Sequence, residues 1–208
     1  MSFVNRSYWD HAIIDRRVED REIVDIFVID PGQDSGWVFL RCPVEDIVKN
    51  GSSVVAYVIE NMGMRSSEIS IGTEHGFAFG EINSVHKEGY LRGEMIASAM
   101  LIRQMQSCFG HHKPHLKFLI LEDFILRERT KSRKLLSPVR LTSLLYDHLY
   151  IVNDFRLRDL SLHFQSPNDI SIITDQQLED SGCWFVGKDD ARSAARHLLI
   201  FLRRLEIK

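Results

Sequence analysis

One eight-residue run of mostly apolar, β-branched side chains constrains the fold of this chain more than any other feature. Residues 23–30 read IVDIFVID, and Pro31 and Gly32 follow at once. A short apolar run that ends in turn-forming residues is typical of a buried β-strand that closes on a turn. The apolar residues 37–40 predict the hairpin partner of this strand. The chain is therefore expected to build its core around a sheet.

The remaining apolar segments predict more strands first, and then helices that alternate with strands. We predict strands at 53–59, 68–72, 76–82, 116–121 and 162–165, and helices at 90–107, at 137–152 and from about residue 190 onward. This order is typical of an α/β layered sheet. A length of 208 residues suits one domain, here 23–208, preceded by a charged extension at 1–22.

Composition narrows the class of protein. The chain is 44% hydrophobic and 26% charged, which suits a folded domain, and it contains no apolar run of the roughly 20 residues that a membrane span needs. The N-terminus lacks the apolar core of a secretory signal, and the three cysteines are far apart with no CxxC pair: Cys42, Cys108 and Cys183. We expect a cytoplasmic protein with reduced thiols and no membrane partner. His111, His112 and His115 surround Pro114, which favours a surface turn over a zinc site.

The net charge of −3 hides a local excess of basic residues. Six of them lie in one stretch against a single acid, Glu128: Arg127, Arg129, Lys131, Arg133, Lys134 and Arg140. Such a patch is compatible with a polyanionic partner such as nucleic acid. Arg192, Arg196 and Arg203 share a face of the last predicted helix, where a phosphate-binding track and a solvated face are equally good interpretations.

Acidic residues stand at the ends of the predicted buried elements. Asp30 ends the first strand, Glu122 ends the strand at 116–121, and Asp190 begins the last helix beside Asp189. If the two strands are neighbours, Asp30 and Glu122 come together, and a last helix packed on the same sheet supplies the third carboxylate. Such a group suits Mg²⁺, which prefers oxygen ligands and retains several water ligands that substrate phosphates can replace. Each acid also has a purely structural explanation, as a turn residue, a solvated strand end or a helix cap.

A resemblance adds to these patterns. The segments VIDPGQDSGWVFL, LILEDFILRERTKSRKLLSPVRL and FQSPNDISIITDQQLEDSGCWFVGKDDARSAARHLLIFLRRL are similar to those of RuvC-like Holliday junction resolvases, especially phage-encoded members. The resemblance implies an RNase H-like mixed sheet, three antiparallel strands and then two parallel ones, flanked by helices. It also implies cleavage of branched DNA by a homodimer with Mg²⁺, for which Mn²⁺ can substitute, in the host cytoplasm if the protein is phage-encoded.

The resemblance assigns the catalytic and metal-binding roles to Asp30, Glu122 and Asp190. The basic residues between Arg127 and Arg140 lie just after Glu122, so we expect them to bind backbone phosphates of DNA near the cut. The last helix departs from the family pattern, because Ser193 stands where its final Asp is expected. Asp190, one turn earlier, is the first candidate to replace that carboxylate, and Asp189 is a weaker candidate than Asp190. Ser171 likewise occupies a position where phage members often carry lysine.

These departures leave three hypotheses. The first is an active Mg²⁺-dependent endonuclease that hydrolyses phosphodiester bonds with two metal ions. The second is a degenerate relative that binds branched DNA or a protein without cutting. The third is an interaction module on the same scaffold, with residues 1–22 or the elaborated region 41–90 as the surface for a protein partner.

Overall fold

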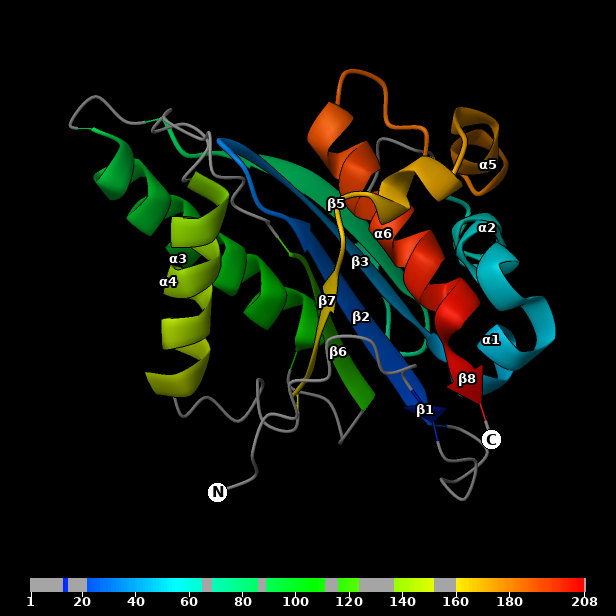
Figure 1. The fold of residues 1–208 in the computed structure, drawn as a ribbon. Coiled ribbons are helices and arrows are strands. Elements are labelled where there is room, and N and C mark those ends of the chain that lie inside the picture. Colours follow the sequence, from blue (N-terminus) through cyan, green and yellow to red (C-terminus); the bar gives the residue numbers. More distant parts are fainter. Residues whose placement is uncertain are drawn as a thin grey trace.

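The computed structural model describes residues 13–14, 22–64, 69–85, 89–110, 116–123, 137–151 and 160–207. They form a mixed six-stranded sheet with helices on both faces (Figure 1). The spatial order of the strands is β4 (Ser70–Ile71), β5 (Gly76–Asn83), β3 (Asp34–Pro43), β2 (Ile23–Asp30), β6 (Leu116–Glu122) and β7 (Leu160–Gln165). Neighbours from β4 to β2 are antiparallel, whereas β2, β6 and β7 are parallel. The predicted α/β mixed sheet is confirmed.

The helices divide between the two faces of the sheet. The long helix α6 (Asp189–Arg204) crosses one face, together with the short helices α1 (Val44–Asn50), α2 (Val54–Asn61) and α5 (Asp175–Asp180) and the 3₁₀ turns η1 (Gly51–Ser53) and η4 (Asp169–Ile172). The other face carries α3 (Tyr90–Phe109) and α4 (Ser137–Ile151). Two strands of two residues each, β1 (Ile13–Ile14) and β8 (Glu206–Ile207), pair in parallel and form a second sheet.

The alternation of side chains along β2 supplies both hydrophobic cores. Val24, Ile26 and Val28 pack with the buried side of α6, whereas Phe27 and Ile29 pack with α3 and α4. Because successive strand residues point to opposite faces, Asp30 continues the row that faces α6. The apolar pattern of β2 therefore determines on which face its terminal carboxyl lies.

Most predicted elements are confirmed, but residues 53–59 are not a strand. They belong to η1 and α2, and the buried residues of α2 are Val54, Val55, Val58 and Ile59, which follow helical spacing. A short run of β-branched residues cannot be assigned from its periodicity alone, and packing against the sheet decides in favour of the helix. The strand predicted at 68–72 is reduced to the two residues of β4, and the short helices α1 and α5 were not predicted.

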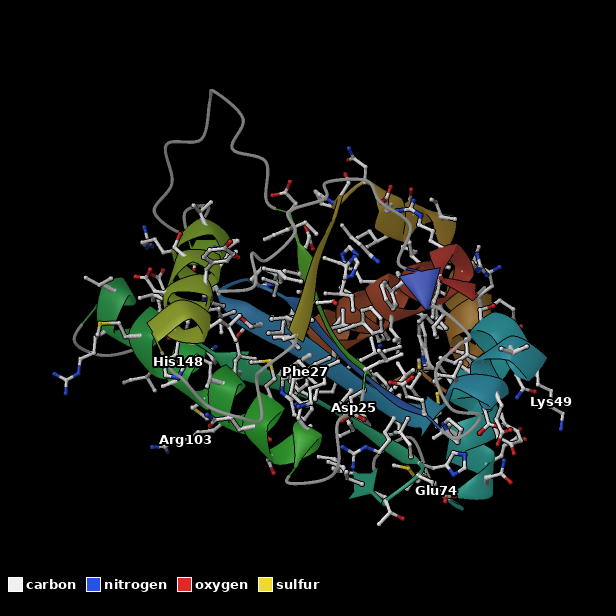
Figure 2. All side chains as sticks on the ribbon, turned by 90° about the horizontal axis from the view of Figure 1, so that it is seen from below. Asp25, Phe27, Lys49, Glu74, Arg103 and His148 are labelled. Carbon is white, nitrogen blue, oxygen red and sulfur yellow. The ribbon has the colours of Figure 1, made fainter. Side chains whose placement is uncertain are left out.

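A buried ion pair links the sheet to the end of α3. Asp25 and Arg41 are opposite each other on β2 and β3, 0% and 1% exposed, and Arg41 Nε donates to Asp25 Oδ1 over 2.7 Å. The guanidinium also donates to the carbonyl oxygens of Cys108 and Phe109, which end α3. Asp25 and Phe27 both belong to β2 and are labelled in Figure 2. The charges are therefore paired and hydrogen-bonded, as buried charges must be.

The three cysteines are buried and unpaired. In the part of the chain that the structure describes, no helix combines the length and the apolar character that a membrane crossing requires.

Candidate metal and active site

A row of polar residues crosses the sheet at one end. Asp30 is paired in register with Gly36, which in turn is opposite Glu81 on β5. On the other side of β2, Ile29 is paired with Leu121, which places Glu122 beside Asp30, and Glu122 is opposite Gln165 on β7. All five positions belong to the face covered by α6. Residues two positions away from Asp30, Gly36, Glu81 and Glu122 belong to the core on that face or pack against it, and His163, two positions before Gln165, lies 5.5 Å from Phe201 of α6, measured between ring centroids. The convergence of Asp30 and Glu122 predicted from the sequence is confirmed.

The carboxyl groups of Asp30 and Glu122 are in direct contact. Burial is the main cause that raises the pKa of Asp30 to about 8, and a hydrogen bond and charge repulsion from Glu122 add to it. Two carboxylates this close cannot both ionise without a compensating charge, so the protonated Asp30 donates to Glu122. The pair therefore holds a proton at a pH at which isolated carboxyls have lost it.

This pair predicts an unusual dependence of stability on pH. Because the folded pKa of Asp30 lies above its ordinary value of 3.8, the unfolded chain releases this proton first, and the contribution to stability is lost as the pH rises from about 4 to about 8. One pKa unit corresponds to about 1.4 kcal/mol, and 1 kcal/mol to about 2–4 °C in a domain of this size. Asp30→Asn cannot ionise, so at pH 8 it should relieve a part of this loss that corresponds to roughly one to two pKa units, or about 1.4–2.8 kcal/mol. The melting temperature of the metal-free protein at pH 8 should therefore rise by roughly 3–11 °C. Thermal unfolding at pH 5 and pH 8 measures this; an equal effect at both values would contradict the interpretation.

Asp190 approaches the pair from the first turn of α6. It is half-buried, and burial is the first cause that raises the pKa of its carboxyl to about 6, followed by the charges of Asp30 and Glu81. The helix reaches this position because Gly36 has no side chain: a Cβ at Gly36 would lie 1.9 Å from the carbonyl oxygen of Asp190. The third predicted acid therefore lies within charge–charge range of Asp30.

Substitution of Gly36 should disturb this approach. Gly36→Ala places a methyl group against the backbone of Asp190 and Ala191, so α6 must move away from the sheet. Overpacking typically costs about 1–3 kcal/mol, which corresponds to a fall in melting temperature of roughly 2–12 °C. Gly76→Ala is the matched control, since a Cβ there has its nearest neighbour, the Cα of Ile71, at 3.3 Å. Equal melting temperatures for the two variants would disprove the close contact.

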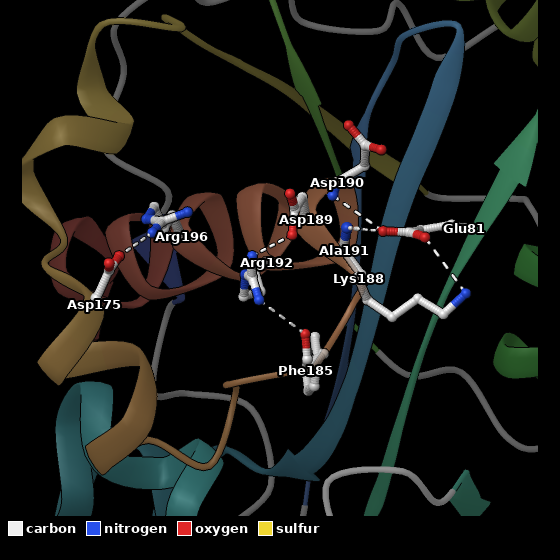
Figure 3. A network of polar contacts seen from close by, with 9 residues as sticks. All are labelled: Glu81, Asp175, Phe185, Lys188, Asp189, Asp190, Ala191, Arg192 and Arg196. Carbon is white, nitrogen blue, oxygen red and sulfur yellow. Dashed lines mark hydrogen bonds and ion pairs between the residues drawn. The ribbon is translucent and has the colours of Figure 1, made fainter.

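Glu81 clamps the start of α6 to β5 (Figure 3). Its Oε1 accepts hydrogen bonds from the backbone N–H groups of Asp190 over 3.1 Å and of Ala191 over 3.3 Å. Its Oε2 lies 3.4 Å from Lys188 Nζ. A carboxylate at a helix N-terminus satisfies free N–H groups and the helix dipole. Glu81 was missed in the sequence because it lies in region 41–90, where no family motif marks it.

Two further residues of α6 face the acidic pair. The hydroxyl of Ser193 donates to Asp30 and lowers the pKa of that carboxyl. His197 Nδ1 lies 2.8 Å from Gln165 Oε1, and its Nε2 lies 3.3 Å from Glu122 Oε2. Burial is the main cause that lowers the pKa of His197 to about 4, so the ring is neutral. His197 and Gln165 were not predicted. For His197 the sequence does carry a signal, because positions 190, 193 and 197 lie on one face of the helix.

The remaining predicted residues of α6 are engaged elsewhere. Asp189 is 81% exposed and pairs with Arg192, whose guanidinium lies 4.4 Å from the ring centroid of Trp184. Arg196 pairs with Asp175 at the start of α5 (Figure 3). Asp189 therefore points away from the acidic pair, and the two arginines attach α6 to its neighbours.

The predicted DNA-binding segment is described only at its end. Arg140 donates from Nε and Nη2 to both carboxylate oxygens of Glu94 over 2.5 Å and 2.6 Å, and Glu94 is fully buried. This pair joins α4 to α3. The other basic residues of this segment lie outside the described residues: Arg127, Arg129, Lys131, Arg133 and Lys134. His111, His112 and His115 also lie outside them.

The donor set suits a hard cation. Mg²⁺ is commonly held by one or two carboxylates together with waters and substrate phosphates, and Asp30 and Glu122 supply such a pair at a point where negative charge is in excess. In their present conformation, no three His, Cys, Asp or Glu side chains among the described residues are arranged as a complete metal site. The pair therefore fits a cation that takes its other ligands from water and phosphate.

Comparison of the chain with protein-family models, curated proteins and solved structures finds no match. The functional interpretation therefore depends on this geometry and on the resemblance of the three sequence segments.

Proposed function

We propose that this protein is a Mg²⁺-dependent endonuclease that cuts branched DNA, with a RuvC-like, RNase H-like fold. The observation that carries the proposal is the contact of Asp30 with Glu122 at adjacent strand ends, with Asp190 brought over them by α6. A strand order of three antiparallel strands, β5, β3 and β2, followed by parallel β6 and β7 supports the proposed kinship.

The residues divide the proposed work among them. Asp30 and Glu122 hold Mg²⁺, and Asp190 supplies a further carboxylate within charge range of Asp30. When bound, a pair of Mg²⁺ ions would activate the attacking water and stabilise the leaving oxygen in phosphodiester hydrolysis. Ser193 orients Asp30 through its hydroxyl, and Lys188 places a cation beside Glu81 at the edge of the site.

DNA binding is proposed for the basic segment from Arg127 to Lys134, which follows Glu122 in the chain. Contacts of these residues with phosphates would position the strand and weaken as salt increases. A homodimer is proposed because two symmetric cuts across a junction match a two-fold axis.

A degenerate DNA-binding protein is the second candidate, and Ser193 favours it. A serine hydroxyl is neutral, and here it is bonded to Asp30 instead of adding a carboxylate to the site. In this alternative the wild-type protein binds a junction without cutting it, and Ser193→Asp confers cleavage.

The test compares a labelled four-way junction with a linear duplex of the same sequence. We expect symmetric nicks near the branch point with Mg²⁺ or Mn²⁺ but not with Ca²⁺, and salt-sensitive binding to the junction in Ca²⁺. Tight binding without cleavage in any metal would support the degenerate protein. If the protein neither binds nor cuts the junction, both proposals are overturned. The search then turns to a protein partner of residues 1–22 or 41–90.

A further inference from the structure

A buried polar chain connects β7 to the acidic pair through α6. His197 is 0% exposed, and each of its ring nitrogens has a polar partner: Gln165 from β7 at Nδ1 and Glu122 from β6 at Nε2. The surrounding positions of α6, such as Ala194 and Leu198, are apolar and belong to the core. An apolar side chain would fill this position without the cost of burying polar groups. The polar chain therefore calls for an explanation beyond packing.

The geometry fixes one oxygen of Glu122. Glu122 ends β6 with a side chain that is 13% exposed, so its carboxyl could turn toward the surface. His197 holds Oε2, and the contact with Asp30 holds the carboxyl toward β2. We propose that His197, itself held by Gln165, is a positioning residue that orients the Glu122 carboxylate for metal binding. This inference rests on the proposed metal site.

The hydrogen-bond chemistry determines the direction of the chain. An ionised carboxylate only accepts, so Nε2–H of His197 donates to Glu122 Oε2, and Nδ1 must accept. The structure places Oε1 of Gln165 at Nδ1. The two ends of a glutamine amide are interchangeable in outline, so turning this amide brings its nitrogen to Nδ1 as the donor that the chain requires. The order of donation is thus Gln165 to His197 to Glu122. Polar residues that support a metal ligand in this way typically change metal affinity by about 10- to 100-fold.

Two substitutions separate positioning from packing. In His197→Gln the amide nitrogen occupies the place of Nε2 and still donates to Glu122, whereas in His197→Asn the shorter amide replaces Nδ1 and reaches only toward Gln165. Both put an amide at the same buried position of α6. A packing role predicts equal behaviour, or the smaller Asn as the milder change. A positioning role predicts that Gln restores function and Asn does not.

The experiment measures Mn²⁺ binding to the purified full-length protein by electron paramagnetic resonance, without DNA. We expect His197→Asn to weaken Mn²⁺ binding by roughly 10- to 100-fold and His197→Gln to bind close to wild type. Gln165→Leu should weaken binding in the same direction, and it provides a second test if His197→Asn does not fold. Ile200→Val is the matched control, because it trims a buried apolar side chain of α6 that has no polar group to donate to Glu122 or Gln165.

The outcomes distinguish the inference from the function on which it rests. If the wild-type protein binds no Mn²⁺, the proposed metal site itself fails. If the wild type binds Mn²⁺ and the Asn, Gln and Leu variants bind it equally well, the site stands and the positioning role is overturned. Melting temperatures of all variants separate a loss of binding from a loss of folding.

Discussion

Asp30→Asn is expected to abolish Mg²⁺-dependent cleavage of a four-way junction and to leave junction binding in Ca²⁺ intact. The asparagine keeps the shape of the side chain but removes the charge that, with Glu122, would hold the cation. A metal ion contributes several kcal/mol to transition-state stabilisation, and about 1.4 kcal/mol is tenfold in rate. We therefore expect the single-turnover cleavage rate to fall by roughly a thousandfold or more.

Asp34→Asn is the matched control for this loss. Asp34 begins β3 and contributes to the charge around Asp190, but it lies outside the row formed by Asp30, Glu122 and Gln165. Its variant should cleave at a rate within about tenfold of wild type, since no proposed metal ligand is removed. Cleavage by Asp30→Asn at the wild-type rate would exclude Asp30 as a metal ligand.

Arg41→Met should be the most destabilising single substitution in the sheet. It leaves the carboxylate of Asp25 buried without its counter-charge and frees the carbonyl oxygens of Cys108 and Phe109. Removing one partner of a buried ion pair costs about 3–5 kcal/mol. At about 2–4 °C per kcal/mol, the melting temperature should fall by roughly 6–20 °C, as measured by thermal unfolding.

The double variant Asp25→Leu with Arg41→Met tests the cause of this loss. Replacing both partners with apolar side chains removes the unpaired charge, so part of the stability should return. If the double variant is less stable than Arg41→Met alone, the carbonyl contacts at the end of α3 are the dominant contribution of Arg41 and the ion pair is secondary.

The sequence predicted the parts of the fold that depend on local patterns. The run at 23–30 is β2, and because its even-numbered residues face α6, the position of Asp30 beside Glu122 follows from pattern and strand order. The strand predicted at 53–59 was wrong, because the β-branched residues there belong to a helix whose formation depends on packing against the sheet and α6. Local preference and tertiary context disagree there, and tertiary context prevails.

The candidate site was predictable only in part, for a related reason. Asp30, Glu122 and Asp190 end or begin elements, so the sequence marks them. Glu81 lies inside β5, and Gln165 ends β7 but carries no charge to mark it. Only the register of β5 and β7 with the central strands places these two residues in the row. Contacts set by register between remote segments leave no local signal in the chain.

The clamp between Glu81 and the first turn of α6 has a consequence for biosynthesis. Asp30, Glu81 and Glu122 leave the ribosome well before residues 189–204, and the acidic pair is covered only when α6 docks on Gly36. A growing chain can form its antiparallel hairpins early, but it cannot complete the candidate site until this helix has been translated. Any nuclease activity would thus be withheld from the nascent polypeptide by the order of synthesis alone.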